Sequence, residues 1–456
     1  MSTVAERHVS HSRQYYAKRA QRQQEGLGQL IKLAQAGSTT MPIPLFGPPV
    51  AYSEVAEPAL PDHGPQEAKG VRHPSLAEPH RKGQRHRGLR STRRFVMSLS
   101  GLCAVVPVRD EGDGLRAALE SLARQTMPPD RVIVVVNNST DATEAVARDV
   151  AAHDHHVEVL VMPGHNQYRK AGALNYGISH LLDEDGRLPA GIDLLLTMDG
   201  DTVHDRHLTA TAARVLAADP QLGGVTAACQ AKPGRGRTTW SWLLMLMQRI
   251  EYGRAAFSRV QRSVHTMAGA GSVYRAQAIN DLLASRPHVF EQRGTNLVED
   301  YETTLALKAH GWKVTANAHC IAYTEVMPTL RMLLAQRHRW VRGTVDEWRR
   351  YGFGHEAVRR SAAGMILALG VFAYTWGWLA TASWRLAHGG HADPRYLLLL
   401  ASWVAYQGLT VRAMGWKIVL FEMTVLPGQL YSLLRTFWIV RAIAASYRRR
   451  SAEWSR

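Results

Sequence analysis

Residues 102–143 read LCAVVPVRDEGDGLRAALESLARQTMPPDRVIVVVNNSTDAT, and this stretch decides the fold class. It holds two short apolar runs, LCAVVP at 102–107 and RVIVVV at 131–136, each bounded by turn residues. The stretch between them has the spacing of an amphipathic helix up to Arg124, and a second helix is expected from about Asp141. Uninterrupted Val, Ile and Leu runs that alternate with helices predict right-handed βαβ units and a mostly parallel, buried sheet.

The same alternation continues toward the middle of the chain. HVEVLVM at 156–162 and DLLLTM at 193–198 are typical of two more strands, and a helix is expected from about Lys170. Ligands of such sheets bind in the crevice beyond the carboxyl ends of the strands. The sequence therefore predicts an α/β domain over residues 99–350, in which helices flank a mostly parallel sheet and the site lies where these strands end.

Composition narrows the class of partner. The 456 residues carry 55 Lys and Arg against 38 Asp and Glu, a net charge of +17. Such a balance suits anionic partners such as nucleic acid, an anionic membrane leaflet or phosphorylated small molecules. At this length more than one domain is expected, because single cores stop growing near ~250–300 residues. Cys103, Cys229 and Cys320 are far apart, which fits a reducing compartment without a disulfide framework or a CxxC metal site.

Residues 1–98 are rich in Pro, His, Gln and charge, and they contain few large aliphatic side chains. Such a composition buries too little apolar surface to offset ordering entropy, so the region is predicted to be mostly disordered, with one possible helix at 13–36. The basic run at 80–94 is either a solvated linker or a juxtamembrane anchor for anionic lipid. No apolar signal-peptide core follows Met1, so the N-terminus is expected in the cytosol.

Residues 351–456 are predicted to form a membrane region with about two transmembrane helices, an interfacial helix and a basic tail. The uncharged run at 361–384 is long enough to cross a bilayer core of ~30 Å, although a buried helix of a soluble protein is the alternative. A shorter run at 396–411 would supply the second crossing, and the segment to Val440 has the pattern of an interfacial amphipathic helix. The tail RAIAASYRRR at 441–450 is expected in the cytosol by the positive-inside rule, which would place the α/β domain on the cytoplasmic side.

Two carboxylates follow the expected strand at 193–198. DLLLTMDGDT places Asp199 and Asp201 just beyond the carboxyl end of this strand, with Gly200 between them. Oxygen ligands at this spacing suit a hard divalent cation, Mg²⁺ or Mn²⁺, that keeps open positions for substrate phosphates. An Asp-Gly turn that only closes the strand is the structural alternative.

Polar and basic groups follow two other strands. Asn137 comes directly after the strand at 131–136, where its amide could bind the edge of a nucleobase or where the turn could simply cap the next helix. Arg169 and Lys170 open a helix, although basic groups at that position oppose the helix dipole. A phosphate bound at the helix start would reverse this cost, and an ordinary surface lysine is the alternative.

A helix with acidic residues in its first turn is expected within LVEDYETTLALKAHGW at 297–312. Asp300 could act there as the general base that takes a proton from an acceptor hydroxyl, with Glu299 beside it. Acidic residues also stabilise the N-terminus of any helix, so this placement has a purely structural explanation as well.

A second amphipathic helix is expected within TLRMLLAQRHRWVRG at 329–343. Gln336, Arg339 and Trp340 share one face of it by their spacing. A guanidinium group suits phosphate and an indole suits stacking on a sugar, whereas a basic interfacial helix next to a membrane would have a similar pattern.

Together, these motifs and their order resemble the family 2 glycosyltransferases of the GT-A fold, the group that contains the cellulose, chitin, hyaluronan and poly-N-acetylglucosamine synthases. The most discriminating piece is QRHRW at 336–340, which matches the family's Q-[QR]-x-R-W pattern in full. VED at 298–300 stands at the place of the family's T-E-D motif, and NNS at 137–139 stands at the place of D-D-G-S.

The resemblance implies a role for each matching residue. On the donor side, the implied residues are Pro107, Glu111, Asn137, Lys170 and Asp199 around the nucleotide, with Asp199 and Asp201 at the metal. On the acceptor side, they are the catalytic carboxylates Glu299 and Asp300, the loop residues Gly271 and Ser272, and Gln336, Arg337, Arg339 and Trp340 around the acceptor and the leaving diphosphate.

The resemblance also implies a membrane-attached enzyme that moves a sugar, with inversion, from a nucleotide sugar to a hydroxyl of a glycan, lipid or protein. The donor is expected to be a UDP-sugar and the cofactor Mg²⁺ or Mn²⁺. Two rival hypotheses are a sugar-nucleotide nucleotidyltransferase, which would release pyrophosphate, and a membrane-tethered nucleic-acid-binding protein. The nucleotidyltransferase hypothesis assigns no role to the helix that contains residues 336–340. The second lacks a face on which basic residues interleave with aromatic ones, so no nucleic acid is expected.

Overall fold

The computed structural model describes residues 99–232, 238–259, 263–294, 296–389, 394–424 and 426–448. The predictions for residues 1–98, including the helix at 13–36 and the basic run at 80–94, lie outside the described residues. The end of the basic tail, beyond Arg448, lies outside them too.

Four parallel strands form the first half of the sheet, as the aliphatic runs predict. β1 (Leu102–Val108), β2 (Arg131–Val136), β3 (Val157–Val161) and β4 (Leu194–Thr197) pair in the spatial order β3-β2-β1-β4. All seven residues of β1 are buried, as expected for a strand with helices on both of its faces. The carboxyl ends of these strands therefore meet at one edge of the sheet.

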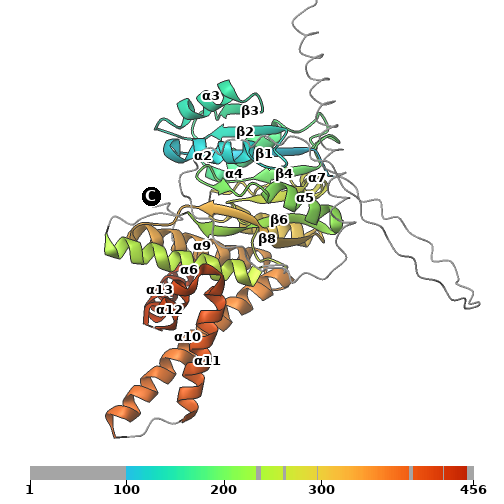
Figure 1. The fold of residues 1–456 in the computed structure, drawn as a ribbon. Helices are drawn as coiled ribbons and strands as arrows, with labels where there is room; N and C mark the ends of the chain where they lie inside the picture. Colours follow the sequence, from blue (N-terminus) through green and yellow to red (C-terminus); the bar gives the residue numbers. More distant parts are fainter. Residues whose placement is uncertain are drawn as a thin grey trace, which may run out of the picture. The chain divides into compact units, whose positions relative to one another are not determined.

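Helices cover both faces of the sheet (Figure 1). One face carries α2 (Gly112–Ala123), α3 (Thr143–His153) and α5 (Leu208–Ala218), and the other carries α4 (Arg169–Ser179), α7 (Ala276–Ser285) and α8 (Glu299–Ala309). Neighbouring residues of β1 belong to opposite cores, because side chains alternate along a strand: Val106 packs on the α2 side and Val105 on the α4 side.

The second half of the sheet contains two reversed strands. β7 (Ser272–Arg275) runs antiparallel to β4 and to β6 (Leu222–Ala231), and β8 (Lys313–Thr324) runs parallel to β6. β5 (Val203–His204) forms the edge antiparallel to β8, so the complete order is β3-β2-β1-β4-β7-β6-β8-β5. The predicted α/β fold, a mostly parallel sheet flanked by helices, is confirmed.

Two long helices lie between the sheet and the C-terminal helices in Figure 1. These are α6 (Thr239–Arg259) and α9 (Leu330–Tyr351), and α9 contains the amphipathic helix expected at 329–343. The hydroxyl of Thr329 caps α9 by accepting a hydrogen bond from the backbone N–H of Met332 at 3.3 Å.

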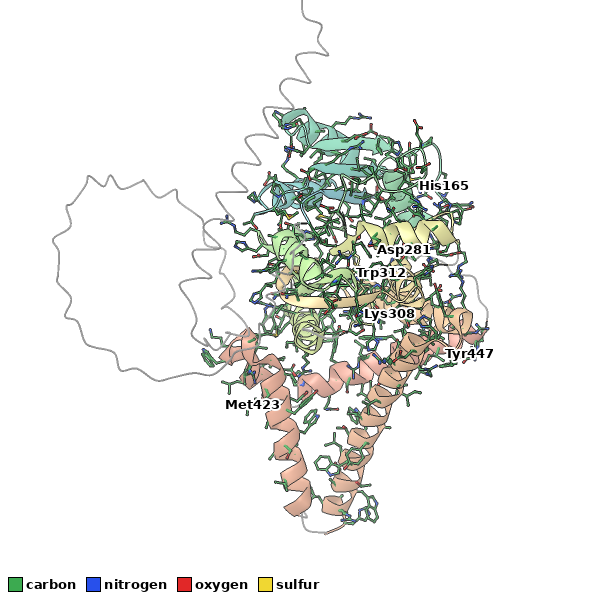
Figure 2. The ribbon with its side chains drawn as sticks, turned by 90° about the vertical axis from the view of Figure 1, so that its right-hand side faces the viewer. His165, Asp281, Lys308, Trp312, Met423 and Tyr447 are labelled. Carbon is green, nitrogen blue, oxygen red and sulfur yellow. The ribbon has the colours of Figure 1, made fainter. Side chains whose placement is uncertain are left out.

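The C-terminal region consists of α10 (Glu356–Ala387), α11 (Pro394–Val411), α12 (Trp416–Met423) and α13 (Leu426–Tyr447), with a short 3₁₀ turn at Arg412–Met414. In Figures 1 and 2, α10 and α11 extend away from the α/β domain, whereas α13 packs against α9. Among the described residues, α10 is the one helix long and apolar enough to cross a membrane, and only 6% of its most apolar stretch is buried. The run at 396–411, expected to supply a second crossing, is helical as α11 but is not among the helices that meet this criterion. The segment expected to be interfacial forms α12 and α13.

Candidate active site

A cavity of about 660 Å³ opens at the carboxyl ends of β1, β2 and β4, where the topology of the sheet predicts a ligand. Its other walls come from the loop before β7, the start of α8, and helices α6 and α9. The predicted site residues that line this cavity are Pro107, Glu111, Asn137, Lys170, Asp199, Asp201, Glu299, Asp300, Gln336, Arg337, Arg339 and Trp340.

Gly271 and Ser272, which were expected to contact the acceptor, are not among the residues that line this cavity. The lining part of their loop is Ala268 to Ala270. Ser272 is fully buried behind the loop, where its hydroxyl donates to the carbonyl oxygen of Ala268 at 2.8 Å and lies 3.0 Å from Thr226 Oγ1. These two residues therefore shape the loop from behind.

The loops beside the β1 and β2 end of the cavity contain three residues in the left-handed backbone region. Asp110 (φ 53°), Asn138 (φ 51°) and Arg169 (φ 58°) follow β1, follow β2 and open α4, respectively. Residues other than glycine rarely adopt this conformation, and it persists where surrounding contacts hold it. Strain at three neighbouring loops is consistent with a functional site.

Asn166 connects two of these loops, and sequence reasoning did not identify it. Its amide Nδ2 donates to Asn137 Oδ1 at 2.9 Å and to the carbonyl oxygen of Arg169 at 2.6 Å. Asn138 Nδ2 donates to the backbone oxygen of Asn166 at 3.0 Å, and the backbone N–H of Asn166 donates back to Asn138 Oδ1 at 3.1 Å. A Cβ at Gly172 would collide with the Asn166 amide, so the glycine makes room for it. The pair of asparagines after an apolar strand was the only available signal.

Three carboxylates gather at the end of β4. Burial and the neighbouring Asp199 raise the pKa of Asp201 to about 6, and burial together with Asp201 raises the pKa of Glu111 to about 8. Gly200 allows this approach, because a Cβ there would lie 2.6 Å from Val108 Cγ1. Mutual repulsion among acidic groups leaves this corner of the cavity suited to a cation.

Lys170 reaches across the cavity to carboxylates from two separate segments. Its Nζ pairs with Asp199 and lies 3.2 Å from Glu299 Oε1. Burial acts to lower the pKa of this ammonium group, but Asp199, Glu299 and Asp300 outweigh that effect and raise it. A Cβ at Gly269 would collide with Lys170 Nζ, which explains the small residue in the loop before β7. Lys170 thus brings the Asp199 turn and the start of α8 together.

Asp300 is held in place by two backbone N–H groups. Gly269 N donates to its Oδ2 at 3.3 Å and Tyr301 N donates to its Oδ1 at 2.7 Å. Burial and the adjacent Glu299 raise its pKa to about 6, although Lys170 opposes that rise. A carboxylate with such a pKa is a better proton acceptor than an exposed aspartate and is still ionised at neutral pH.

Helix α9 closes the cavity with the QRHRW segment at 336–340. Arg339 lies near Glu299, Asp300 and Asp199, and burial lowers the pKa of its guanidinium in spite of them. Gln336 Oε1 is buried at the cavity wall and accepts no hydrogen bond from the described residues. The Arg337 guanidinium is 2.7 Å from Glu251 Oε2, so its charge is balanced by a protein carboxylate.

Asp154, His155 and His156 lie close enough together to share a metal ion, and they are the only three His, Cys, Asp or Glu side chains in the described ranges that do so. It lies in the turn between α3 and β3 and does not line the cavity.

Residues 100–343, more than half of the chain, match the family model described as glycosyltransferase like family 2. The chain therefore belongs to this family, and the prediction that it is a family 2 glycosyltransferase is confirmed.

Several individual proteins are also similar to this chain. A probable glucomannan 4-beta-mannosyltransferase 4 from Oryza sativa subsp. japonica is 23% identical over 262 residues, which are 54% of this chain and 43% of that protein. The chain thus aligns with less than half of the plant protein's length.

Two solved structures are similar at lower identity. One is the mannosyltransferase PcManGT from Pyrobaculum calidifontis in complex with GDP-Man and Mn²⁺, with 17% identity, a TM-score of 0.49 and coverage of 78% of this chain and 89% of that one. The other is TarS from S. aureus in complex with UDP, with 14% identity, a TM-score of 0.36 and coverage of 77% and 93%.

Proposed function

We propose that this glycosyltransferase moves a sugar from a nucleotide-sugar donor to a hydroxyl acceptor by a single in-line displacement that inverts the anomeric carbon. The observation that carries the proposal is the convergence of Asp199 and Asp201 with Asp300 in one cavity, joined by Lys170. Carboxylates at two separate points of one cavity can serve leaving-group departure and hydroxyl deprotonation at the same time.

Positive charge at the donor end fits a nucleoside diphosphate. Lys170 lies beside Asp199, and Arg339 faces the same carboxylates from α9. The Asn137 amide offers both donor and acceptor groups to a nucleobase edge, so both uracil and guanine are compatible with it. UDP-sugars are the expected donors. Because guanine is also compatible with Asn137, a test should include GDP-sugars as well.

The residues present fit a divalent cation held between the protein and the diphosphate. Asp199 already pairs with Lys170, which leaves Asp201 as the direct protein ligand and Asp199 as a supporting one. Two carboxylates do not complete an octahedral shell, so phosphate oxygens and water supply the other positions. When bound, Mg²⁺ or Mn²⁺ would offset the charge that develops on the leaving diphosphate.

Asp300 acts as the base in this proposal. Its carboxylate is fixed by the N–H groups of Gly269 and Tyr301, and it takes the proton of the incoming hydroxyl as the bond to the anomeric carbon forms. The hydroxyl of an acceptor sugar can donate to Gln336 Oε1, while Trp340 supplies an apolar platform. The acceptor is a glycan, a lipid or a protein hydroxyl.

The C-terminal region attaches the enzyme to a membrane, with the α/β domain on the cytoplasmic side. Support comes from the apolar surface of α10 and α11, which the rest of the described chain leaves uncovered. Its exposed members are Ile366, Leu367, Val371, Tyr374, Trp384, Leu386, Leu398, Tyr406 and Leu409. A patch of this size on a soluble monomer would be unusual.

The test uses membranes that contain the full chain, a panel of radiolabelled UDP- and GDP-sugars, and Mg²⁺ or Mn²⁺. Wild type should transfer label from one donor and release the nucleoside diphosphate rather than pyrophosphate. Asp300→Asn should abolish transfer yet bind UDP or GDP as wild type does, whereas Asp185→Asn, at an exposed loop position, should change neither. Continued turnover by a folded Asp300→Asn enzyme would remove Asp300 from this role.

A further inference from the structure

Three helices meet beside Trp340 in a partly buried charged cluster. Arg337 of α9 is 3% exposed, and its Nη2 donates to Glu251 Oε2 of α6 at 2.7 Å. The hydroxyl of Tyr431, on α13, donates to the same oxygen of Glu251 at 2.8 Å. One carboxylate oxygen of α6 therefore binds α9 and α13 together.

The Arg337 guanidinium also contacts two aromatic rings that line the cavity. Its Cζ lies 4.3 Å from the centre of the Trp340 ring and 5.6 Å from that of Tyr252. Both distances are within the range of cation–π attraction. Because Glu251 fixes the guanidinium and the guanidinium contacts the indole, the position of Trp340 depends on the Glu251–Arg337 pair.

Tyr431 is itself anchored in the core between α9 and α13. Its ring meets the ring of buried Trp438 edge-on, with 5.7 Å between their centres. Trp438 packs with Leu333 of α9 and Leu244 of α6 in one apolar cluster. A displacement of α13 would therefore withdraw the Tyr431 hydroxyl from Glu251.

We propose that Glu251, Arg337 and Tyr431 are positioning residues that hold Trp340 at the acceptor wall and make its placement depend on the docking of α13. This inference rests on the proposed function for the meaning of the acceptor wall. It replaces the expected direct role of Arg337 at the diphosphate. The competing role is direct ligand contact through Arg337 Nε, which is buried and has no hydrogen-bond partner among the described residues.

The test compares three variants with one control in the full-length enzyme. Tyr431→Phe removes only the hydroxyl, Glu251→Gln removes the charge, and Arg337→Lys keeps the charge but loses the planar group that faces the indole. Tyr447→Phe is the matched control, because it makes the same change on an exposed tyrosine of α13.

The first measurement follows Trp340 without any need for turnover. The enzyme is labelled with 5-fluorotryptophan, and the ¹⁹F resonance of Trp340 is assigned as the one missing from Trp340→Phe. We expect this resonance to shift or broaden in all three variants and to stay unchanged in Tyr447→Phe. An unchanged Trp340 resonance in folded Tyr431→Phe and Arg337→Lys would overturn the inference, whether or not the proposed function is correct.

The second measurement separates donor from acceptor effects. In the variants, transfer to membrane acceptors should fall by about tenfold, while hydrolysis of the same donor and the affinity for UDP or GDP with Mn²⁺ stay within about twofold of wild type. A parallel loss of nucleotide affinity in Arg337→Lys would instead identify Arg337 as a diphosphate ligand and contradict the inference. Failure of wild type to turn over any donor would count against the proposed function alone, because the ¹⁹F result decides the positioning role independently.

Discussion

Asp300 and Asn166 show how single residues set the properties of the cavity. Asp300 is held by backbone N–H groups from its own helix and from the loop before β7, and burial with Glu299 raises its pKa to about 6. Asn166 belongs to no sequence motif and does not line the cavity. Its side-chain amide nevertheless fixes Asn137 and the turn at Arg169. Each side chain depends on partners far away in the sequence.

The pKa of Asp300 predicts the acid limb of the pH profile. A general base works only when it is deprotonated, so kcat/KM should be constant near neutral pH and fall by about tenfold per unit below about pH 6. The measurement is the initial rate of transfer between pH 5 and 8 at low donor concentration. A profile that stays flat through pH 6 would contradict the assignment of Asp300 as the base.

Asn166→Ala should weaken nucleotide binding although Asn166 does not line the cavity. The change removes hydrogen bonds that link the loops after β2 and before α4, so the affinity for UDP or GDP should fall by roughly tenfold, or about 1.4 kcal/mol. Asn280→Ala is the matched control, because Asn280 bridges to Leu188 outside the cavity. Calorimetric titration with UDP or GDP should show lost affinity in Asn166→Ala and unchanged affinity in Asn280→Ala, whose effect is limited to stability.

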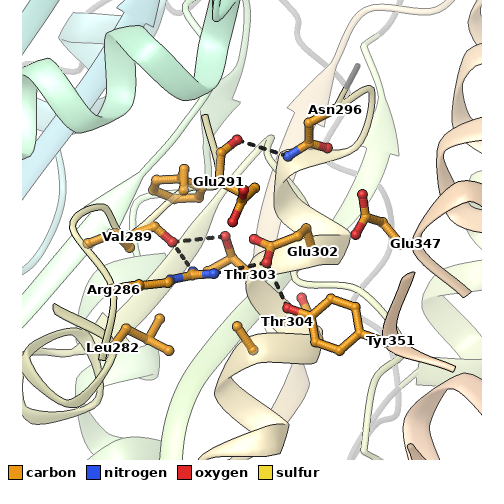
Figure 3. Close-up of polar contacts among 12 residues, drawn as sticks. Leu282, Arg286, Val289, Glu291, Asn296, Glu302, Thr303, Thr304, Glu347 and Tyr351 are labelled. Atoms are coloured by element: carbon orange, nitrogen blue, oxygen red, sulfur yellow. Dashed lines mark hydrogen bonds and ion pairs between the residues drawn. The ribbon is translucent and has the colours of Figure 1, made fainter. Parts of the chain in front are cut away.

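At the scale of elements, a buried ionic network joins α7, α8 and α9 (Figure 3). Arg286, just after α7, donates to Glu302 Oε1 of α8 at 2.9 Å, and the hydroxyl of Tyr351 of α9 donates to the same oxygen at 2.7 Å. Glu302 is fully buried, so both partners are needed to offset its desolvation. Glu302 is two residues from Asp300 on α8, and the network fixes α8 against α9.

Tyr351→Phe should therefore lower the stability of this junction. It removes a hydrogen bond to a buried carboxylate, with an expected cost of about 1.5–3 kcal/mol and a lower apparent Tm in detergent. Tyr374→Phe, on the exposed surface of α10, is the control and should leave the Tm unchanged. Equal melting temperatures for the two variants would show that the network adds little to stability.

The elements also show why some of the fold could be predicted from the sequence and some could not. β1 and β2 consist almost entirely of aliphatic residues between turns, so their type and their parallel pairing followed from the pattern. β6 reads LGGVTAACQA, with small and polar residues, and at Gly224 a Cβ would collide with Met267, so its composition conceals a central strand. Small residues there reflect close packing, which only the three-dimensional structure reveals.

The part of the candidate site that follows strands could be predicted from the sequence, and the part that depends on three-dimensional packing could not. Asp199 and Asn137 follow strands, so the topology of a parallel sheet brings them to one edge. Glu251 and Tyr431 are 180 residues apart and belong to no motif, and nothing in the sequence signals that they share a hydrogen bond. Gly271 and Ser272 were assigned by motif alone, although burial places Ser272 behind the lining.

At the scale of the whole molecule, the α/β domain meets the C-terminal region through α6 and α9, and also where α8 packs against the start of α10. The part of the cavity wall formed by α6 and α9 and the surface that packs against α13 lie on the same two helices. Figures 1 and 2 show α10 and α11 extending from this layer in the direction away from the sheet. The proposed membrane attachment and the proposed acceptor site therefore share one structural layer.

Arginine substitutions on α10 should test the membrane proposal. Leu367→Arg with Val371→Arg places two charges on an exposed apolar face, at about 2.5–3.5 kcal/mol each near the centre of a bilayer. We expect the double variant to be released from membranes by alkaline carbonate, whereas wild type and Glu184→Arg, a change at an exposed loop position, stay bound. Retention of the double variant would indicate that α10 does not cross the bilayer.

The central claim is a single displacement at the anomeric carbon with Asp300 as the base. The most direct measurement is the configuration of the sugar first released when the enzyme slowly hydrolyses an α-linked nucleotide sugar, followed by ¹H NMR before mutarotation. A single displacement releases the β-anomer first, and Asp300→Asn should abolish its release. Initial release of the α-anomer would contradict a single displacement, because it requires a second displacement for which this geometry assigns no nucleophile.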